Sequence, residues 1–211
     1  MKVILAARFS AFAFLLAALF TAFVTRSGFR IVGVLLPRQA WLLDHAALWA
    51  LGWWFWLSAI FSWMTVLVAL LWSYLPGHRI GSMLQSGLMI LAAVFLTTAA
   101  LLWMNLLPFA AAHAMATDFV PLIDTLALTA LGAGFLMMGG VTGWICVDLW
   151  RGKLLPLWLV SPGLLCALAL LPMPFYLPGT VLPALGVLLW VVWCLLLGLR
   201  RSLPSAYSEW V

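Results

Sequence analysis

Five polar residues of this chain could bind a ligand or transfer a proton: Asp124, Asn105, His113, Asp118 and His45. The order of the apolar segments predicts that all five lie on the same side of a membrane. Asp124 is the strongest candidate, because it lies inside a long apolar run and an ionisable side chain in a membrane helix is costly unless it has a function or a partner. We therefore expect a polar, ligand-binding pocket around Asp124.

Each of these residues also has a structural interpretation. Asp124 could instead bond Asn105 or a hydroxyl group and so hold two helices together. An aspartate just before a helix, such as Asp44 or Asp118, can cap free N–H groups and complement the helix dipole. The side chains of Asp44, His45, His113 and Asp118 are of types that bind metals, but their spacing matches no metal motif. We therefore predict no metal site.

No motif of catalytic chemistry is present in the sequence. It contains no glycine-rich phosphate loop, zinc-protease motif, serine elbow or cysteine–histidine dyad, and its histidines are predicted at helix ends rather than at haem-binding positions. The three cysteines, Cys146, Cys166 and Cys194, lie in apolar runs and are expected to be buried and reduced. We predict no catalytic residue, and the sequence specifies no cofactor.

The elements that must position the polar residues are membrane helices. Of the 211 residues, 67% are hydrophobic and 7% are charged, whereas soluble domains carry roughly 25% charged residues. Lipid must therefore be the solvent of this chain. The net charge of +5 comes from basic residues at the ends of apolar runs, which favours contact with lipid headgroups over nucleic acid.

The apolar runs predict an all-α, polytopic membrane bundle that forms one domain over residues 1–211. Its six transmembrane helices are expected at about 9–25, 46–75, 81–107, 119–149, 154–171 and 182–199. The first resembles the apolar core of a signal peptide but is longer and has no good cleavage site, so we expect it to be retained. Pro108 is expected to end the third helix, and the glycines of the fourth indicate close packing.

The basic residues predict the orientation. Residues 26–43, which include Arg26, Arg30 and Arg38, are expected to lie as an interfacial segment in the headgroup plane. The side that holds both termini collects seven basic residues: Lys2, Arg8, Arg79, Arg151, Lys153, Arg200 and Arg201. Seven against three predicts that both termini are cytoplasmic. We expect a bacterial plasma membrane, with a thylakoid-type membrane as the alternative, and we call the side opposite the termini the outer side.

The second predicted helix, residues 46–75, has two different faces. Four tryptophans form one stripe, here called the tryptophan face: Trp49, Trp53, Trp56 and Trp63. The opposite face carries Ser58, Ser62, Thr65 and Ala69. Small and weakly polar residues usually face neighbouring helices. We therefore expect the serine face to point inward and the tryptophan face to dock on lipid, on a membrane-protein partner or on a hydrophobic ligand.

Three classes of function are compatible with these features. The first, which we prefer at this point, is a non-enzymatic component of a membrane complex, or an assembly element, that docks through the tryptophan face. The second is a small transporter or a substrate-binding membrane subunit with a pocket on the outer side around Asp124. The third is an enzyme that acts on a lipid at the outer interface. In size and topology the chain resembles the six-helix substrate-capture subunits of vitamin and metal importers, which implies the second class by architecture alone.

Overall fold

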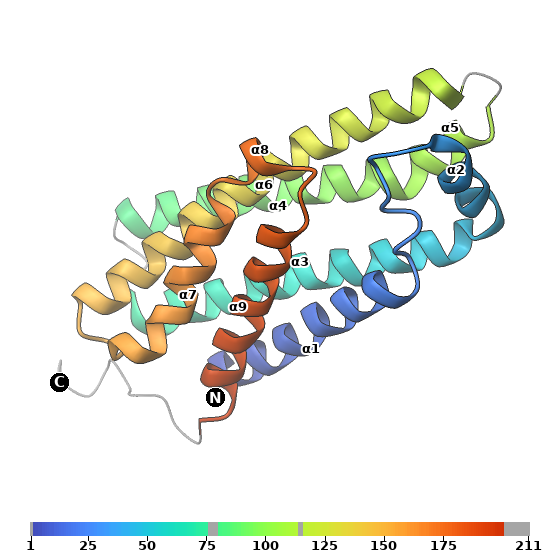
Figure 1. Cartoon of the computed structure of the whole chain (residues 1–211). Coiled ribbons are helices and arrows are strands. Elements are labelled where there is room, and N and C mark those ends of the chain that lie inside the picture. Colours follow the sequence, from blue (N-terminus) through green and yellow to red (C-terminus); the bar gives the residue numbers. More distant parts are fainter. Residues whose placement is uncertain (1, 76–79, 114–115, 201–211) are drawn as a thin grey trace.

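The computed structural model describes residues 2–75, 80–113 and 116–200, and within these residues all regular structure is helical (Figure 1). The elements are α1 (Lys2–Phe23), α2 (Leu35–Asp44), α3 (Ala46–Tyr74), α4 (Ile80–Leu101), η1 (Leu102–Leu106), α5 (Leu107–Ala111), α6 (Ala116–Arg151), α7 (Leu157–Leu170), α8 (Met173–Tyr176) and α9 (Val181–Gly198). In lipid each backbone N–H and C=O group must be satisfied within its own segment, and apolar helices meet this requirement. The prediction of a helical membrane bundle is confirmed.

Six helices form a closed ring. Along this ring α1 packs on α3, α3 on α4, α4 on α6, α6 on α7, α7 on α9, and α9 returns to α1. The start of α1 and the end of α9 meet where Arg8 Nε donates a hydrogen bond of 2.7 Å to the carbonyl oxygen of Gly198. Because α1 starts where α9 ends, the chain enters and leaves the bundle at the same end, as Figure 1 shows.

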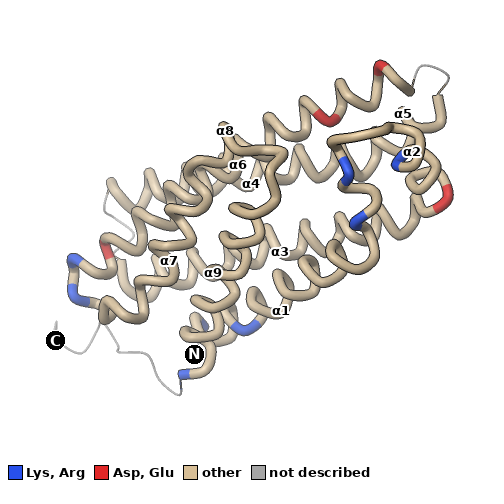
Figure 2. The backbone as a smooth tube through the Cα atoms, viewed as in Figure 1, with Lys and Arg blue, Asp and Glu red and all other residues tan. Residues whose placement is uncertain are grey.

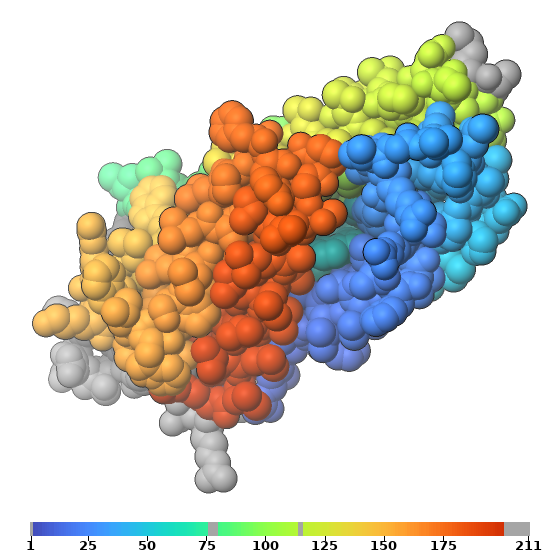
Figure 3. Space-filling model, viewed as in Figure 1, coloured from blue at the N-terminus to red at the C-terminus, as the bar shows by residue number. Residues whose placement is uncertain are grey.

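Five of the described helices are long and apolar enough to cross a membrane, and α7 is a shorter apolar helix of 14 residues. The hairpin of α7, α8 and α9 turns back at the middle of α6, where a Cβ on Gly132 would lie 3.1 Å from Cα of Pro174. In Figure 3 this hairpin (orange to red) covers the end of the molecule near the termini, whereas the chain between α1 and α3 (blue) covers the other end. The outer part of α6 therefore extends beyond the hairpin.

The predicted ends of the helices are close to those observed, except at the start of the first helix, which was expected at residue 9 and lies at Lys2, and around Pro108. The helical run does not end there. It passes through the π-helical turn η1 and continues as α5 to Ala111. A proline inside a helix clashes with the carbonyl group four residues earlier and lacks an N–H donor. The wider turn of a π-helix changes this pairing, so that Leu107 N–H bonds the carbonyl oxygen of Leu102.

The predicted outward orientation of the tryptophan face of α3 is wrong. Trp49, Trp53 and Trp63 are 1%, 5% and 0% exposed and face the interior, and Trp56 is half-buried, with its indole donating to Thr21 Oγ1 at 2.8 Å. These tryptophans do not form a docking face.

The serine face of α3 is partly buried and partly exposed. Ser62 points inward and donates to Ser10 Oγ at 3.0 Å. Ser58 and Thr65 are exposed, and their hydroxyl groups donate to carbonyl oxygens of their own helix, those of Trp54 and Phe61, at 3.0 and 2.9 Å. A hydroxyl group that bonds its own helix can face lipid, because it leaves no unsatisfied donor.

Charged residues of the described chain gather at the two ends of the bundle and leave a broad uncharged band between them (Figure 2). Such a band is what the hydrocarbon core of a membrane requires. Arg79 and Arg201, which contribute to the orientation argument, lie outside the described residues. The cytoplasmic location of the termini stays a prediction.

Candidate functional site

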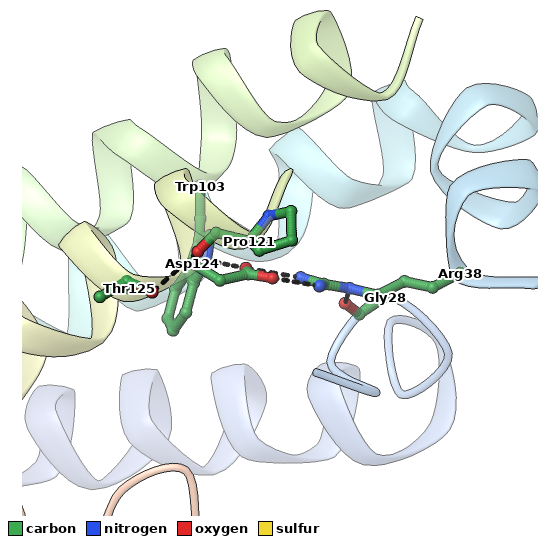
Figure 4. A network of polar contacts seen from close by, with 6 residues as sticks. All are labelled: Gly28, Arg38, Trp103, Pro121, Asp124 and Thr125. Carbon is green, nitrogen blue, oxygen red and sulfur yellow. Dashed lines mark hydrogen bonds and ion pairs between the residues drawn. The ribbon is translucent and has the colours of Figure 1, made fainter. Parts of the chain in front are cut away.

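A buried ion pair between Arg38 and Asp124 lies at the outer end of the bundle (Figure 4). The two side chains are 3% and 7% exposed. Both terminal nitrogens of the guanidinium donate to the carboxylate: Nη1 to Oδ2, and Nη2 to Oδ1 at 2.9 Å. Arg38 Nε donates to the carbonyl oxygen of Gly28 at 2.7 Å. The guanidinium of Arg38 and the carboxylate of Asp124, paired through two parallel hydrogen bonds, hold α2 against α6.

Trp103 provides the third donor to Asp124. Its indole N–H bonds Oδ1 at 2.8 Å, so this oxygen accepts two hydrogen bonds and Oδ2 accepts one. Trp103 lies in η1, which brings the ring toward α6. The carboxylate is thus held by two N–H groups of the guanidinium and by one N–H of the indole.

The π-helical turn also explains a bond from α3. Leu107 N–H bonds the carbonyl oxygen of Leu102, and Pro108 has no N–H to offer to the next carbonyl group, that of Trp103. The indole N–H of Trp49 donates to this oxygen at 2.6 Å. Trp49 thus fixes the backbone of Trp103, and the indole of Trp103 in turn bonds Asp124.

An aromatic cluster surrounds the hydrogen bonds that link Trp49, Trp103 and Asp124. Its members are Phe29, Trp41, Trp49, Trp53 and Trp103, with ring centroids 4.8 to 6.2 Å apart in the contacting pairs. The chain before α2 passes close to it at Gly28, where a Cβ would lie 2.6 Å from Cζ3 of Trp49. Glycine therefore allows the backbone to approach the ring, and the carbonyl group of Gly28 reaches Arg38.

A depression of about 220 Å³ lies beside the ion pair. Its polar lining comes from Arg30, Arg38, Asp124 and Thr125. Its apolar lining includes Ile31, Leu35, Val120 and Leu128. One wall is therefore the segment between α1 and α2 together with the start of α2, and the other is the outer part of α6.

The structure separates the five candidate residues. Asp124 is buried and lines the depression, whereas Asn105, His113, Asp118 and His45 are all exposed and none of them lines it. Asp124 bonds Arg38 and Trp103, so the expectation that Asn105 or a hydroxyl group is its partner is wrong. Asn105 follows Trp103 by two residues in η1, and this places the two side chains on different sides of the turn.

The two histidines lie against aromatic rings close to them in the sequence, and the two aspartates lie at helix ends. His45 stacks on Trp41, with ring centroids 5.1 Å apart, and the ring of His113 lies 4.7 Å from that of Phe109. Asp44 is the last residue of α2 rather than a side-chain cap of α3, and Asp118 lies in the first turn of α6. Among residues 2–75, 80–113 and 116–200, no three His, Cys, Asp or Glu side chains could share a metal ion.

Arg38 and Trp103 are the site residues that the sequence argument missed. Arg38 was expected at the interface, as one of three similar arginines in residues 26–43. A buried carboxylate needs a cation or several donors nearby, so Asp124 was itself the signal that one of these arginines reaches inward. The spacing of the arginines does not identify which one.

Fold and site together define a multi-pass helical membrane protein with a charged depression at its outer end. Comparisons of the chain with family models, with curated proteins and with solved structures found no match.

Proposed function

We propose that this chain is a non-enzymatic, substrate-binding membrane protein whose ligand enters the depression beside Arg38 and Asp124. The observation that carries this proposal is the ion pair itself, which lines a depression instead of being sealed on all sides by apolar packing. Buried charges are retained where they serve recognition or specificity, since they add little stability compared with apolar residues.

Burial of the tryptophan face removes the main support for a docking protein. Trp49, Trp53 and Trp63 are almost fully buried, and the indoles of Trp49 and Trp63 donate to Trp103 O and Thr142 Oγ1, at 2.6 and 3.2 Å. These residues contribute to the fold. The substrate-binding class, in contrast, is supported by the depression beside Asp124, which is the one of the five candidate residues that lines it.

Filling the depression tests this function without breaking the ion pair. Thr125 lines the depression and is exposed, and its hydroxyl group bonds only its own helix, at the carbonyl oxygen of Pro121. Thr125→Trp should place an indole in the space that the ligand would occupy. Native mass spectrometry of the full chain, purified in mild detergent, would compare the small molecules that each variant retains. We expect at least about a tenfold loss of the retained species, which corresponds to about 1.4 kcal/mol of binding free energy.

Thr129→Trp is the matched control. Thr129 is one turn further along α6, is exposed, and bonds its own helix at the carbonyl oxygen of Thr125, but it does not line the depression. It should retain the same molecules as the native chain. Equal retention by the two variants would contradict the proposed function.

A further inference from the structure

We propose that the ligand of this depression is an anionic amphiphile, whose negatively charged headgroup binds Arg30 and Arg38 and whose apolar part remains in the outer leaflet. This inference rests on the proposed function and adds the chemical class of the ligand. It follows from the charge of the lining, from the level of the depression in the membrane and from its apolar surroundings.

The lining has an excess of positive charge. Two guanidinium groups, those of Arg30 and Arg38, face one carboxylate, that of Asp124. The guanidinium of Arg30 has no hydrogen bond or ion pair with any residue in the described part of the chain, and it is exposed. Arg38 uses three of its five N–H groups on Asp124 and Gly28. An anionic headgroup would accept hydrogen bonds from the remaining donors and balance the charge of Arg30.

The depression lies at the level of lipid headgroups. Arg151 marks the inner end of α6. At ~1.5 Å per residue, Gly132 lies about 28 Å from it along the helix, and Asp124 about 40 Å. The hydrocarbon core is ~30 Å thick, and the membrane with its headgroups about 40–45 Å. With Arg151 at the inner surface of the membrane, the turn of the hairpin at Gly132 lies in the outer part of the core, and Asp124 lies in the outer headgroup layer.

Exposed apolar side chains alternate in the sequence with residues that line the depression. In the segment between α1 and α2, Val32 and Val34 are 81% and 75% exposed, and Leu36, in the first turn of α2, is 72% exposed. Side chains of this kind are costly in water and stable against acyl chains. The site is thus bounded by lipid, so that a molecule with an acyl chain can enter it from the side.

The size of the depression fits a headgroup rather than a whole ligand. Its volume of about 220 Å³ is below the roughly 300–1,000 Å³ that drug-sized ligands occupy. A lipid headgroup that is bound by the arginines fits this volume when its acyl chains stay outside the depression. A free inorganic anion would also reach the arginines but would leave the apolar border unused.

The test is a titration of the full chain, purified in a nonionic detergent and followed by native mass spectrometry. The probes are dihexanoyl phosphatidylglycerol, which is anionic, dihexanoyl phosphatidylcholine, which is zwitterionic, and inorganic phosphate. We expect the anionic lipid to bind about tenfold more tightly than the zwitterionic one, as one charge-assisted hydrogen bond would provide, and phosphate alone to bind at least tenfold more weakly than the anionic lipid.

Arg30→Gln should bring the affinity for the anionic lipid down to that for the zwitterionic lipid, and Arg30→Lys should retain most of it. The matched control is Arg26→Gln, because Arg26 is exposed in the same segment but does not line the depression. Equal affinities for the two lipids, equal effects of Arg30→Gln and Arg26→Gln, or phosphate binding as tight as that of the anionic lipid would overturn this inference. Thr125→Trp separates the two proposals. If it blocks a retained molecule whose binding does not depend on charge, this inference fails and the proposed function stands. If it changes neither lipid binding nor the retained molecules, both fail.

Discussion

The indole N–H of Trp49 replaces the backbone donor that Pro108 cannot supply to the carbonyl oxygen of Trp103, and the two atoms lie 2.6 Å apart. This bond links α3 to the π-helical turn that carries Trp103. Through the indole of Trp103 it also supports Asp124, which accepts that N–H at 2.8 Å. A tryptophan on one helix thus positions the carboxylate of another.

Trp49→Phe should destabilise the protein more than Trp53→Phe. Both indoles are buried, but the N–H of Trp53 has no hydrogen-bond partner among the described residues. The two changes remove similar volumes, so the difference between them reports the bond from Trp49 to the Trp103 carbonyl group. We expect a difference of about 1–2 kcal/mol in the free energy of unfolding, measured by SDS titration in mixed micelles. Equal losses would show that this bond adds nothing to stability.

Trp103→Phe should remove one of the three donors to Asp124 and leave the ion pair with Arg38 in place. The expected loss is about 1–3 kcal/mol, because the acceptor is a buried charge. The control is Trp193→Phe, since Trp193 is 0% exposed and its N–H also lacks a partner in the described chain. Thermal unfolding in detergent would compare the two variants, and a control loss as large as that of Trp103→Phe would argue against this role.

Arg38→Gln and Asp124→Asn should each cost about 3–5 kcal/mol, because each leaves the other charge buried and unpaired. The double variant should cost clearly less than the two single costs added together, with a coupling of about 0.5–3 kcal/mol. Unfolding free energies of the four chains form the double-mutant cycle. Arg26→Gln, at an exposed position of the same segment, should change stability by no more than ~0.5 kcal/mol. Additive costs would mean that the two side chains do not interact in the membrane.

Two adjacent glycines of α6 should respond differently to alanine. A Cβ on Gly139 would lie 2.9 Å from the carbonyl oxygen of Ala167 in α7, whereas a Cβ on Gly140 would have its nearest contact at 3.8 Å, with Leu88. Gly139→Ala should therefore destabilise by about 1–3 kcal/mol. Gly140→Ala should be neutral or stabilise by up to ~1 kcal/mol, since alanine favours the helix. Loss of stability in Gly140→Ala alone would contradict the packing of α6 on α7.

The helices were predictable from the sequence because lipid imposes a local rule. An apolar segment without charges must satisfy its own backbone groups, and a helix does so whatever its neighbours are. The sequence also indicated Asp124, because an acid within an apolar run is conspicuous on cost alone. The glycines of α6 indicated close packing for a similar reason, since small side chains allow backbones to approach.

Tertiary structure decided which faces of the helices point inward and which arginine binds Asp124. Tryptophan can face lipid or the interior, and the fold turns Trp49, Trp53 and Trp63 of α3 inward. The N–H groups of Trp49 and Trp63 find acceptors on other helices, at Trp103 O and Thr142 Oγ1. Ser58 and Thr65 can face outward because they bond their own helix. Arg30 and Arg38 have the same chemistry in the sequence. Only the path of the chain past Trp49 at Gly28 brings Arg38 to the carboxylate and leaves Arg30 exposed.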